Sequence, residues 1–564
     1  MAGVGGSLVA EQIRIVSLLA RGAMFAPFRA VAMLRVRAPE RLLIAPQDIR
    51  TTDPTMAGDI YAGWFSLAGR TINMHGHSPF DVVPPSAAWQ DELESFVWLR
   101  HLRAADTALS RINARAFIVD WMGLRSKSRG HTAWRADITA RRLICWLSQS
   151  PLILDGADAA FYRRFMKCIG RHGAVLQNYL RAGVQGEARL LVCIALVELA
   201  LCAQGLGKLE KQATRSLTEE LKRQILPDGG HIGRNPQVLV DLLLDLLPLR
   251  RAYAARGLAP PDALLNTIDR MMPMLRLFRH SNGSLALFNG MGRSEADALA
   301  TVLAYDDARA SPLENAPASG YQRVAFGASV LVMDSGKPPQ AEFSRTAHAG
   351  TLAIEFSCGG QLLLVNCGAP DAERTLLREA SRLTAAHSTL VINDVSSSRF
   401  GPQRKDTERG AGPGPAIVAG PTNIKLARET DARGVKIAAS HDGYVKRFGV
   451  IHERRVRLSP DGAVLKGEDL LIPTGKTTPA LHFVVRFHLV PSAEVEVLPD
   501  GSAALVTLAD GQNWLMTTEG LAISAEDSAF FAAPEGPRAS RQLVIAADAA
   551  TATRVAWRFA LQAE

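Results

Sequence analysis

Apolar side chains recur every three or four residues from about residue 57 to residue 320, with short polar breaks between the runs. This spacing is typical of helices that bury one face. It predicts successive helices over residues 88–114, 133–149, 159–180, 186–205, 211–225, 236–256 and 261–278. A small extended segment is expected before them, around GRTINMHGHSPFDVVPP. Antiparallel helices in this order favour a toroid of helix pairs.

The residue pattern changes after Pro312, where apolar and polar residues alternate and β-branched side chains become frequent. A period of two, punctuated by Gly and Asn-Asp turns, predicts an antiparallel β-sandwich. The expected fold class is therefore α+β and multidomain: an N-terminal α/α toroid, an incomplete barrel of helix pairs, followed by a C-terminal antiparallel β-sandwich. We expect an amphipathic or extended segment at residues 1–56, the toroid at 57–312 and the sandwich at 313–564. The Gly- and Pro-rich loop at 401–423 is expected to be mobile.

The N-terminal stretch mixes apolar residues with charges and lacks the uninterrupted apolar core of a secretory signal. It is typical of an amphipathic basic helix. A docking element, a membrane-surface segment and an over-long predicted start remain open as explanations. The most apolar internal run, at 190–203, contains Glu198 and is too short to cross a bilayer, so no transmembrane segment is expected.

Composition narrows the class of protein and of partner. A chain of 564 residues is too long for one core, and 47% hydrophobic with 21% charged residues excludes a disordered chain. The formal charge of +9 fits an acidic partner. Zinc-finger spacing, RNA-recognition motifs and long basic blocks are missing from the sequence, so nucleic acid is not expected. The six cysteines form no C-x-x-C pair, and four lie in apolar helical stretches, which predicts buried free thiols.

A glycine turn and a run of polar residues precede the helix that begins near Pro236, in the stretch ILPDGGHIGRNP. The Asp-Gly-Gly sequence allows a tight turn, and proline is tolerated at a first helical position. We expect His231, Arg234 and Asn235 to present polar groups outward from this rigid helix end, which is a reasonable place for a site. The alternative is that His231 and Asn235 only cap the helix and close the turn.

Four stretches, taken in this order, carry a resemblance: ILPDGGHIGRNP at 225–236, HAGTLAIEFSCGGQLLLVNCG at 348–368, TAAHSTLVIND at 384–394 and HDGY at 441–444. With a helical toroid followed by a sandwich, the chain resembles the heparinase II/III family of polysaccharide lyases over most of its length beyond residue 60. The resemblance implies β-elimination of a uronic-acid-containing, glycosaminoglycan-like polysaccharide. In that reaction the uronate carboxylate is neutralised, a base takes the neighbouring proton, and an acid protonates the departing oxygen.

The sequence departs from the family in the helical region. The family's Asn-His pair falls near residues 183–185, where Gln185 is the one remaining polar side chain. The family's tyrosine after DGGH falls on Val238, which cannot move a proton. Tyr444 and Tyr305 are the natural substitutes as proton donors, since a phenol can donate to the leaving oxygen. The alternative is that each tyrosine only anchors a loop.

The sandwich departs as well. Thr346 stands in place of the first His of the family's H-x-H pair, and His348 is the second. The family's metal-binding Asp falls on Asn366, a weaker neutral ligand, while His387 keeps the other imidazole. The resemblance therefore implies that His348, Asn366 and His387 hold one divalent metal ion such as zinc, with no other cofactor. The alternative is a set of hydrogen-bonded core side chains.

The remaining roles follow from a cleft that binds a uronate. His231 would act as base or acid, Asn235 would hydrogen-bond the sugar, and Arg234 would pair with its carboxylate. Gln185 and Trp134 would contact the substrate, Trp134 by stacking, although tryptophans at helical spacing are usually core. Arg141 and Arg142 are among the arginines that could form a basic rim.

The leading hypothesis is a carbon–oxygen lyase acting on an acidic polysaccharide. Its rival is a catalytically degenerate polysaccharide-binding or cell-envelope assembly protein that keeps the lyase scaffold, because fold does not establish activity. The resemblance implies the cell envelope or periplasm, yet no signal peptide is visible, so the cytoplasm stays open. A homodimer is compatible with the sequence.

Overall fold

The computed structural model describes residues 38–125, 131–306, 310–402, 414–475 and 481–562. It falls into two compact units. The first contains the chain up to Arg223 together with Leu244–Asn266, and the second contains Gln224–Leu243, Thr267–Lys405 and Pro413–Glu564. The units interleave along the sequence, so the predicted domain limits at residues 57 and 313 stay a prediction. Most of the expected N-terminal segment and the middle of the expected mobile loop lie outside the described residues.

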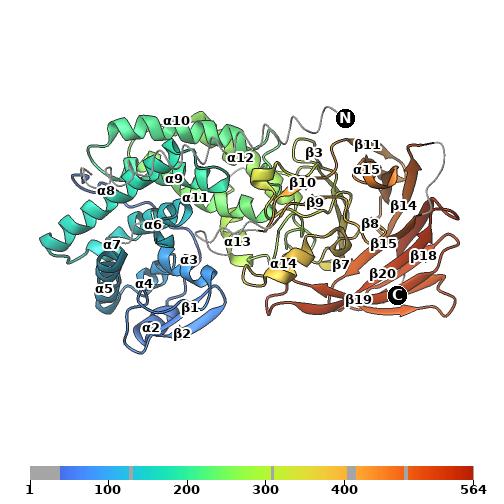
Figure 1. The fold of residues 1–564 in the computed structure, drawn as a ribbon, viewed down its shortest axis with the longest axis horizontal. Helices are drawn as coiled ribbons and strands as arrows, with labels where there is room; N and C mark the ends of the chain where they lie inside the picture. Colours follow the sequence, from blue (N-terminus) through green and yellow to red (C-terminus); the bar gives the residue numbers. More distant parts are fainter. Residues whose placement is uncertain (1–37, 126–130, 307–309, 403–413, 476–480, 563–564) are drawn as a thin grey trace. The chain divides into compact units, whose positions relative to one another are not determined.

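The first unit is mainly helical (Figure 1). Its elements are α2 (Thr55–Tyr61), β1 (Trp64–Leu67), β2 (Arg70–Asn73), α3 (Ala87–Ser95), α4 (Leu99–Ala105), α5 (Ala108–Arg125), η1 (Thr132–Trp134), α6 (Ala136–Ser148), α7 (Ser150–Leu154), α8 (Ala159–Arg181), α9 (Glu187–Cys202) and α10 (Gly207–Gln224). Helices α11 (Pro236–Ala255) and α12 (Asp262–Leu277) contribute residues to both units. The expected extended segment is the β1–β2 hairpin.

Most helix limits agree with the periodicity, with one correction. The helix predicted over residues 88–114 is three helices, α3 to α5, because the chain turns sharply twice within it. Phe96 and Asp106 adopt left-handed φ angles of 59° and 43° and end α3 and α4. Elsewhere local signals hold: the Asp158 carboxylate accepts a hydrogen bond from the Phe161 N–H at 2.7 Å and caps α8.

The core of the first unit is aromatic and contains a buried arginine. Helix α6 packs against α8 and α9. Arg142 of α6 is fully buried, and its guanidinium lies 4.1 Å from the ring centroid of Trp121. It donates to the Glu94 and Ala133 carbonyls and, at 2.8 Å, to His172 Nε2. The expectation that Arg142 forms part of a basic rim is therefore wrong.

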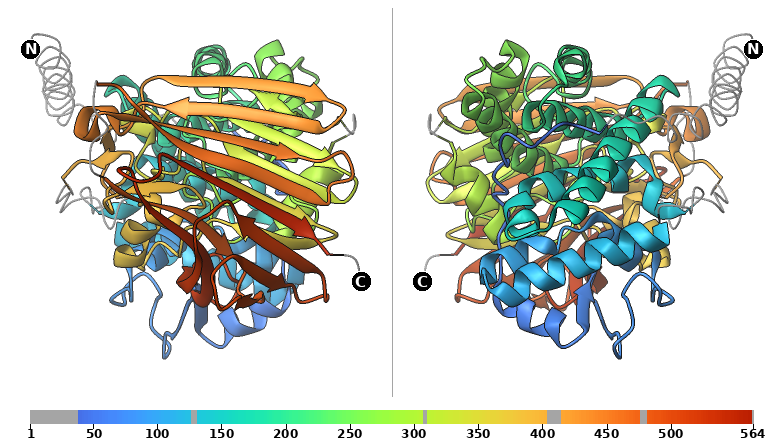
Figure 2. Two further views of the ribbon diagram at one scale, coloured as in Figure 1. Left: turned by 90° about the vertical axis from the view of Figure 1, so that its right-hand side faces the viewer. Right: turned by 90° about the vertical axis from the view of Figure 1, so that its left-hand side faces the viewer.

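The second unit contains two large antiparallel sheets, whose long strands run side by side in Figure 2. The eight-stranded sheet has the order β11-β12-β13-β14-β21-β18-β17-β16, and the nine-stranded sheet has the order β19-β20-β15-β7-β6-β5-β4-β3 with β8 paired to β15. The strands are β3 (Asn315–Ala316), β4 (Tyr321–Phe326), β5 (Ser329–Asp334), β6 (Ile354–Cys358), β7 (Gln361–Val365), β8 (Leu390–Ile392), β9 (Arg399–Phe400), β10 (Ile417–Ala419), β11 (Ile424–Asp431), β12 (Gly434–His441), β13 (Val450–Leu458), β14 (Val464–Pro473), β15 (His482–Leu489), β16 (Glu494–Val497), β17 (Ala503–Thr507), β18 (Asn513–Thr518), β19 (Ile523–Phe530), β20 (Arg538–Asp548) and β21 (Arg554–Leu561).

The short helix α13 (Ala296–Ala304) precedes these strands, and η2 (Ala341–Phe343), α14 (Thr375–Ser381), η3 (Thr384–Ala386) and α15 (Val445–Phe448) lie between them. Alternate residues of β13 are buried, as expected for a strand with one face in the core. The sandwich core includes Ile437, Val456, Phe487 and Trp557. The predicted order of helices followed by antiparallel sheets is confirmed.

The sandwich also buries a polar network. Arg454 and Asp469 form a bidentate ion pair at 2.7 and 3.0 Å. His452 Nε2 lies 2.7 Å from the same carboxylate, and His452 Nδ1 lies 3.2 Å from His441 Nε2. All four side chains are buried, so each polar group must find a partner within the protein.

Two further expectations concern the whole chain. All six cysteines are free and buried, as predicted. Within the described ranges, no helix is both long enough and apolar enough to cross a membrane.

Candidate functional site

The DGGH turn is a tight hairpin within the second unit. Ile225 and His231 form an isolated antiparallel bridge, and the Leu226 N–H donates to the Gly230 carbonyl at 2.8 Å. Gly229 has a φ of +86°, and a Cβ atom at this position would lie 2.0 Å from the Arg270 carbonyl oxygen. Only glycine fits both constraints. The sequence therefore predicted this turn correctly, but not which way its side chains face.

His231 is buried beneath the turn. It is 1% exposed, its Nδ1 accepts from the Gly233 N–H at 3.1 Å, and its Nε2 lies 3.2 Å from Gln224 Oε1. Because Nδ1 accepts, the proton sits on Nε2 and points at the glutamine oxygen. Burial lowers the pKa of His231 to about 3, so the ring is neutral at physiological pH. Contrary to expectation, neither nitrogen faces outward.

Arg234 is also turned inward. All three of its guanidinium nitrogens donate, to the carbonyls of Ser319, Gly320 and Lys337 and to the Asp334 carboxylate. The guanidinium lies 4.6 Å from the Tyr321 ring centroid, and the backbone holds a left-handed φ of 63°. Burial opposes the charged form, but Asp334 outweighs it and raises the pKa of Arg234. Arg234 thus already has a carboxylate partner inside the protein.

Asn235 lies at the start of α11, where its Oδ1 accepts from the Gln237 N–H at 3.0 Å. This contact corresponds to the helix-cap alternative. Val238, on which the resemblance places the family's tyrosine, is buried one turn further on. The helix end therefore offers an amide whose oxygen caps the helix, and an aliphatic side chain.

Three residues that sequence reasoning missed complete this region: Tyr321, Asp334 and Asn289. The Tyr321 hydroxyl donates to the Arg234 carbonyl at 2.7 Å and accepts from Asn289 Nδ2 at 2.7 Å. Asn289 Nδ2 also donates to Asp334 at 3.1 Å, and its Oδ1 accepts from the His348 N–H at 3.2 Å. The signal was available, because the β4–β5 hairpin register places Tyr321 directly opposite Asp334.

His348 and His387 lie together in the second unit, with His348 Nδ1 3.0 Å from His387 Nε2. His387 Nδ1 lies 2.8 Å from the Leu383 carbonyl, which can only accept, so His387 carries its proton on Nδ1. His387 Nε2 then accepts from His348 Nδ1, which leaves His348 Nε2 as a lone pair. Burial lowers the pKa of both imidazoles, that of His387 to about 4.

The predicted metal ligands do not fit a metal ion as they stand. The two imidazoles are joined directly by a hydrogen bond instead of being spread around a common point. Asn366 donates to Glu355 Oε1 at 3.0 Å and accepts from the Ser388 N–H at 3.0 Å, which engages both ends of its amide. Among the described residues, no group of three or more His, Cys, Asp or Glu side chains is arranged to hold a metal. We derive no chemistry through a metal here.

The two candidate tyrosines, Tyr444 and Tyr305, lie on other segments of the chain than the DGGH turn. Tyr444 is fully buried and its hydroxyl donates to the Leu390 carbonyl at 3.1 Å, so it anchors the segment before α15. Burial raises the pKa of the Tyr444 phenol, which makes it a weaker acid. Tyr305 is half-buried at the C-terminal end of α13.

The two candidates in the first unit are engaged as well. Gln185 is half-buried, and its Oε1 accepts from Arg223 at 3.3 Å while its Nε2 donates to the Gly183 carbonyl. Trp134 is 4% exposed and packs against Trp121 and His172. It therefore belongs to the aromatic core and presents no face on which a sugar could stack.

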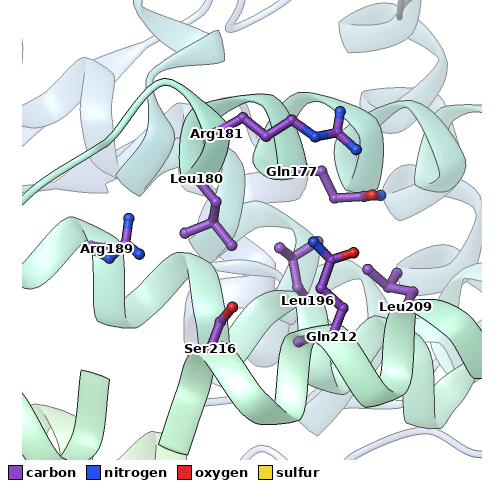
Figure 3. Close-up of a pocket in the computed structure, with 9 residues that line it drawn as sticks. Gln177, Leu180, Arg181, Arg189, Leu196, Leu209, Gln212 and Ser216 are labelled. Atoms are coloured by element: carbon purple, nitrogen blue, oxygen red, sulfur yellow. The ribbon is translucent and has the colours of Figure 1, made fainter. Parts of the chain in front are cut away.

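A pocket that sequence reasoning did not identify lies in the first unit, between α8, α9 and α10 (Figure 3). Its volume is about 170 Å³. Leu180, Leu196 and Leu209 supply apolar walls, and the polar lining comes from Gln177, Arg181, Arg189, Gln212 and Ser216.

Comparison with known proteins decides the family. Residues 308–558 match the family model described as "Heparinase II/III-like, C-terminal". The chain is 31% identical over 502 residues to FtsZ-localized protein C of Caulobacter vibrioides, an alignment that covers 87% of this chain and 85% of that protein. The chain belongs to the heparinase II/III-like family.

Solved structures support the heparinase II/III-like fold along nearly the whole chain. The crystal structure of heparinase III matches with a TM-score of 0.71 at 14% identity, covering 99% of this chain and 92% of that one. A mutant of the heparan sulfate lyase HepC from Pedobacter heparinus matches with a TM-score of 0.64 at 15% identity, covering 97% and 89%. These matches confirm the predicted fold class, a helical toroid followed by a β-sandwich. At such low identity they show the fold alone.

Proposed function

We propose that this heparinase II/III-like protein acts by binding and does not catalyse β-elimination. Its relative is named for localisation with FtsZ, and we propose that the present chain likewise localises with FtsZ, as an assembly component on a lyase scaffold. The absence of catalysis corresponds to the rival hypothesis from the sequence, a catalytically degenerate polysaccharide-binding or cell-envelope assembly protein, and the localisation with FtsZ is added by the comparison. The side chains of the second unit favour it over the lyase hypothesis.

One observation carries the proposal: His231, Arg234 and Tyr444, which were predicted to move protons or to hold the uronate, are buried and already have partners. β-Elimination needs a base, an acid and a cation that reach a common point on the substrate. His231 is enclosed beneath its turn, Tyr444 lies in the sandwich core, and Arg234 is paired with Asp334. Val238 occupies the position where the family has a tyrosine. Nothing in this set is arranged to act on a polymer.

One nitrogen favours the lyase as a second candidate. His348 Nε2 is left as a lone pair by the hydrogen bonds described above, and the described residues supply no hydrogen bond to it. A neutral imidazole with an available lone pair can accept a proton. If β-elimination persists, His348 is the side chain on which it should depend.

The test is to incubate the full-length protein with a panel of acidic polysaccharides and follow the ultraviolet absorbance of the unsaturated uronate product. We expect flat traces for the wild-type protein, together with co-localisation of a fluorescent fusion with FtsZ in cells. An absorbance increase that disappears in His348→Ala, but persists in a matched variant of the exposed His75, would overturn the proposal in favour of the lyase. Failure of the fusion to follow FtsZ would remove the assembly role.

A further inference from the structure

Strand β11 forms one end of the eight-stranded sheet (Figure 1). It runs over eight residues, Ile424–Asp431, and pairs with β12 along one side. Among the described residues, no strand pairs with its other side. An unpaired edge presents a row of backbone N–H and C=O groups that a further strand can bind. The side chains of β11 therefore decide which strand fits there.

The other three sheet ends are poorly suited to pairing with a second copy of themselves. β3 has only two residues. β16 reads Glu-Val-Glu-Val, and β19 has two acids and no base. Pairing such strands with themselves tends to set like charges opposite each other, which is destabilising. β11 differs, because it carries bases and acids on one strand: Lys425, Arg428, Glu429 and Asp431.

Two copies of β11 would pair antiparallel about a two-fold axis. In an antiparallel pair, opposite residues direct their N–H and C=O groups either both toward the partner strand or both away from it, so the axis passes through a residue. An axis at Lys425, Arg428 or Glu429 sets that charge against itself. An axis at Ala427 sets Lys425 opposite Glu429 of the second copy, twice over. This register pairs residues 424–430 and places no like charges directly opposite each other.

The side chains beside Ala427 suit this register. Lys425, Ala427 and Glu429 are exposed, on the face of the sheet that points away from the sandwich core. Leu426 points toward the core face, since it lies opposite the core residue Ala439, yet it is 38% exposed. An axis at Ala427 puts the two Leu426 side chains diagonally across from each other, within reach of long side chains. Pairing would therefore cover an apolar side chain at the edge.

The charges of β11 also limit which strand can be added. Lysine on an edge strand discourages pairing with strands that offer it no acid, whereas β11 itself supplies that acid at the symmetric position. The Glu429 carboxylate lies 3.8 Å from Lys436 Nζ, and its side chain is still 63% exposed. Arg428 is held within its own chain, where it donates to the Glu314 carboxylate at 2.8 Å and to a backbone carbonyl. Lys425 and Glu429 are thus the charges that a second copy would meet.

We propose that this protein forms a two-fold dimer in which the β11 strands of two copies pair antiparallel about Ala427. The two eight-stranded sheets then continue into one another, and Lys425 and Glu429 form two equivalent ion pairs across the junction. The inference goes beyond the proposed function, and neither depends on the other.

Sedimentation velocity of the full-length protein over a range of concentrations tests the dimer. The wild-type protein should shift from monomer to dimer as its concentration rises. Lys425→Glu and Glu429→Lys each replace two opposite-charge pairs by two like-charge pairs, so each should raise the dissociation constant of the dimer about tenfold. The double variant exchanges the charges and should dimerise like the wild type. An equimolar mixture of the two single variants should also dimerise, because each supplies the charge that the other lacks.

The matched control is Lys466→Glu, because Lys466 is an exposed lysine of β14, an interior strand of the same sheet. It should dimerise like the wild type. A wild-type protein that stays monomeric at every concentration overturns the inference. So does a dimer that Lys425→Glu leaves unchanged, or a mixture of the single variants that is no more dimeric than either variant alone.

The two proposals can fail separately. A monomer that follows FtsZ and forms no unsaturated product would overturn the dimer alone. A dimer that depends on Lys425 but produces the ultraviolet absorbance of a lyase would overturn the non-catalytic function alone.

Discussion

The DGGH turn of the second unit and the pocket of the first unit contain similar polar side chains that are used differently. At the turn, His231 and Arg234 have their hydrogen bonds filled by neighbouring groups of the protein. At the pocket, Arg181 donates to one neutral partner within the described part of the chain, the Asn178 side chain, and Gln212 is exposed. A buried polar group whose partners are complete stabilises the fold, whereas a group with unused donors can bind a ligand. The comparison teaches that residue identity alone does not mark a site.

The largest expected effect tests the first half of this comparison. Asp334→Ala should lower the free energy of unfolding by about 3–5 kcal/mol, because it leaves the buried Arg234 guanidinium without its counter-charge. Urea denaturation followed by circular dichroism measures it. A double variant, Arg234→Met with Asp334→Leu, should recover part of the loss, because it removes the unpaired charge but leaves the carbonyls of Ser319, Gly320 and Lys337 without their donor. If Asp334→Ala were as stable as Arg181→Gln, the turn would not be the closed, self-satisfied region described here.

The next largest expected effect is a loss of stability at acid pH, which comes from the buried imidazoles. The pKa of His231 is about 3 and that of His387 about 4 in the folded protein, against 6.5 for an unburied histidine. The unfolded chain therefore binds more protons below pH 6.5, so stability is complete above that pH and falls as pH decreases towards these values. Protonation of each imidazole in the unfolded chain should lower the free energy of unfolding by about 1.6 kcal/mol between pH 6.5 and pH 5.

The urea midpoint measured from pH 7.5 to pH 5 checks this dependence. His231→Gln should make the fall less steep by about one proton, and His75→Gln, at an exposed position, should not change it. A wild-type midpoint that stayed constant over this range would contradict the burial of these rings.

A smaller effect sharpens the interpretation of Tyr444. Tyr444→Phe removes the hydrogen bond to the Leu390 carbonyl and should cost about 1 kcal/mol of unfolding free energy. Localisation with FtsZ should be unaltered, since the side chain only anchors its segment. A loss of localisation with normal stability would return Tyr444 to the list of functional groups.

The smallest effect on stability belongs to the pocket. Arg181→Gln should change the free energy of unfolding by less than about 0.5 kcal/mol, as for most exposed substitutions. Thermal unfolding of the variant beside the wild-type protein measures this difference. A large destabilisation would mean that Arg181 is structural, like Arg234.

Local patterns were sufficient for the architecture but not for the direction of the key side chains. The Asp-Gly-Gly turn and the start of α11 at Pro236 follow from neighbouring residues. The inward orientation of Arg234 depends on Asp334, which is 100 residues further along the sequence and is brought close by folding. Periodicity carries no information about such a pairing.

Some of what was missed could have been predicted. A two-residue turn at Gly327-Ala328 fixes the β4–β5 register and sets Tyr321 opposite Asp334. The burial of Arg142 could not have been predicted, because its partners are backbone carbonyls and a histidine from other segments. The pocket was missed because its arginines and glutamines are spread over three helices with no motif.

The interleaving of the two units limits how this protein can be divided. The segment matched by the family model begins at residue 308, whereas Arg234, the partner of Asp334, precedes it and belongs to the same packed unit. A sandwich excised at that boundary would carry an uncompensated acid in its interior. The sandwich is therefore not expected to fold when it is excised or recombined at the boundary suggested by the family match. Such a fragment should be insoluble.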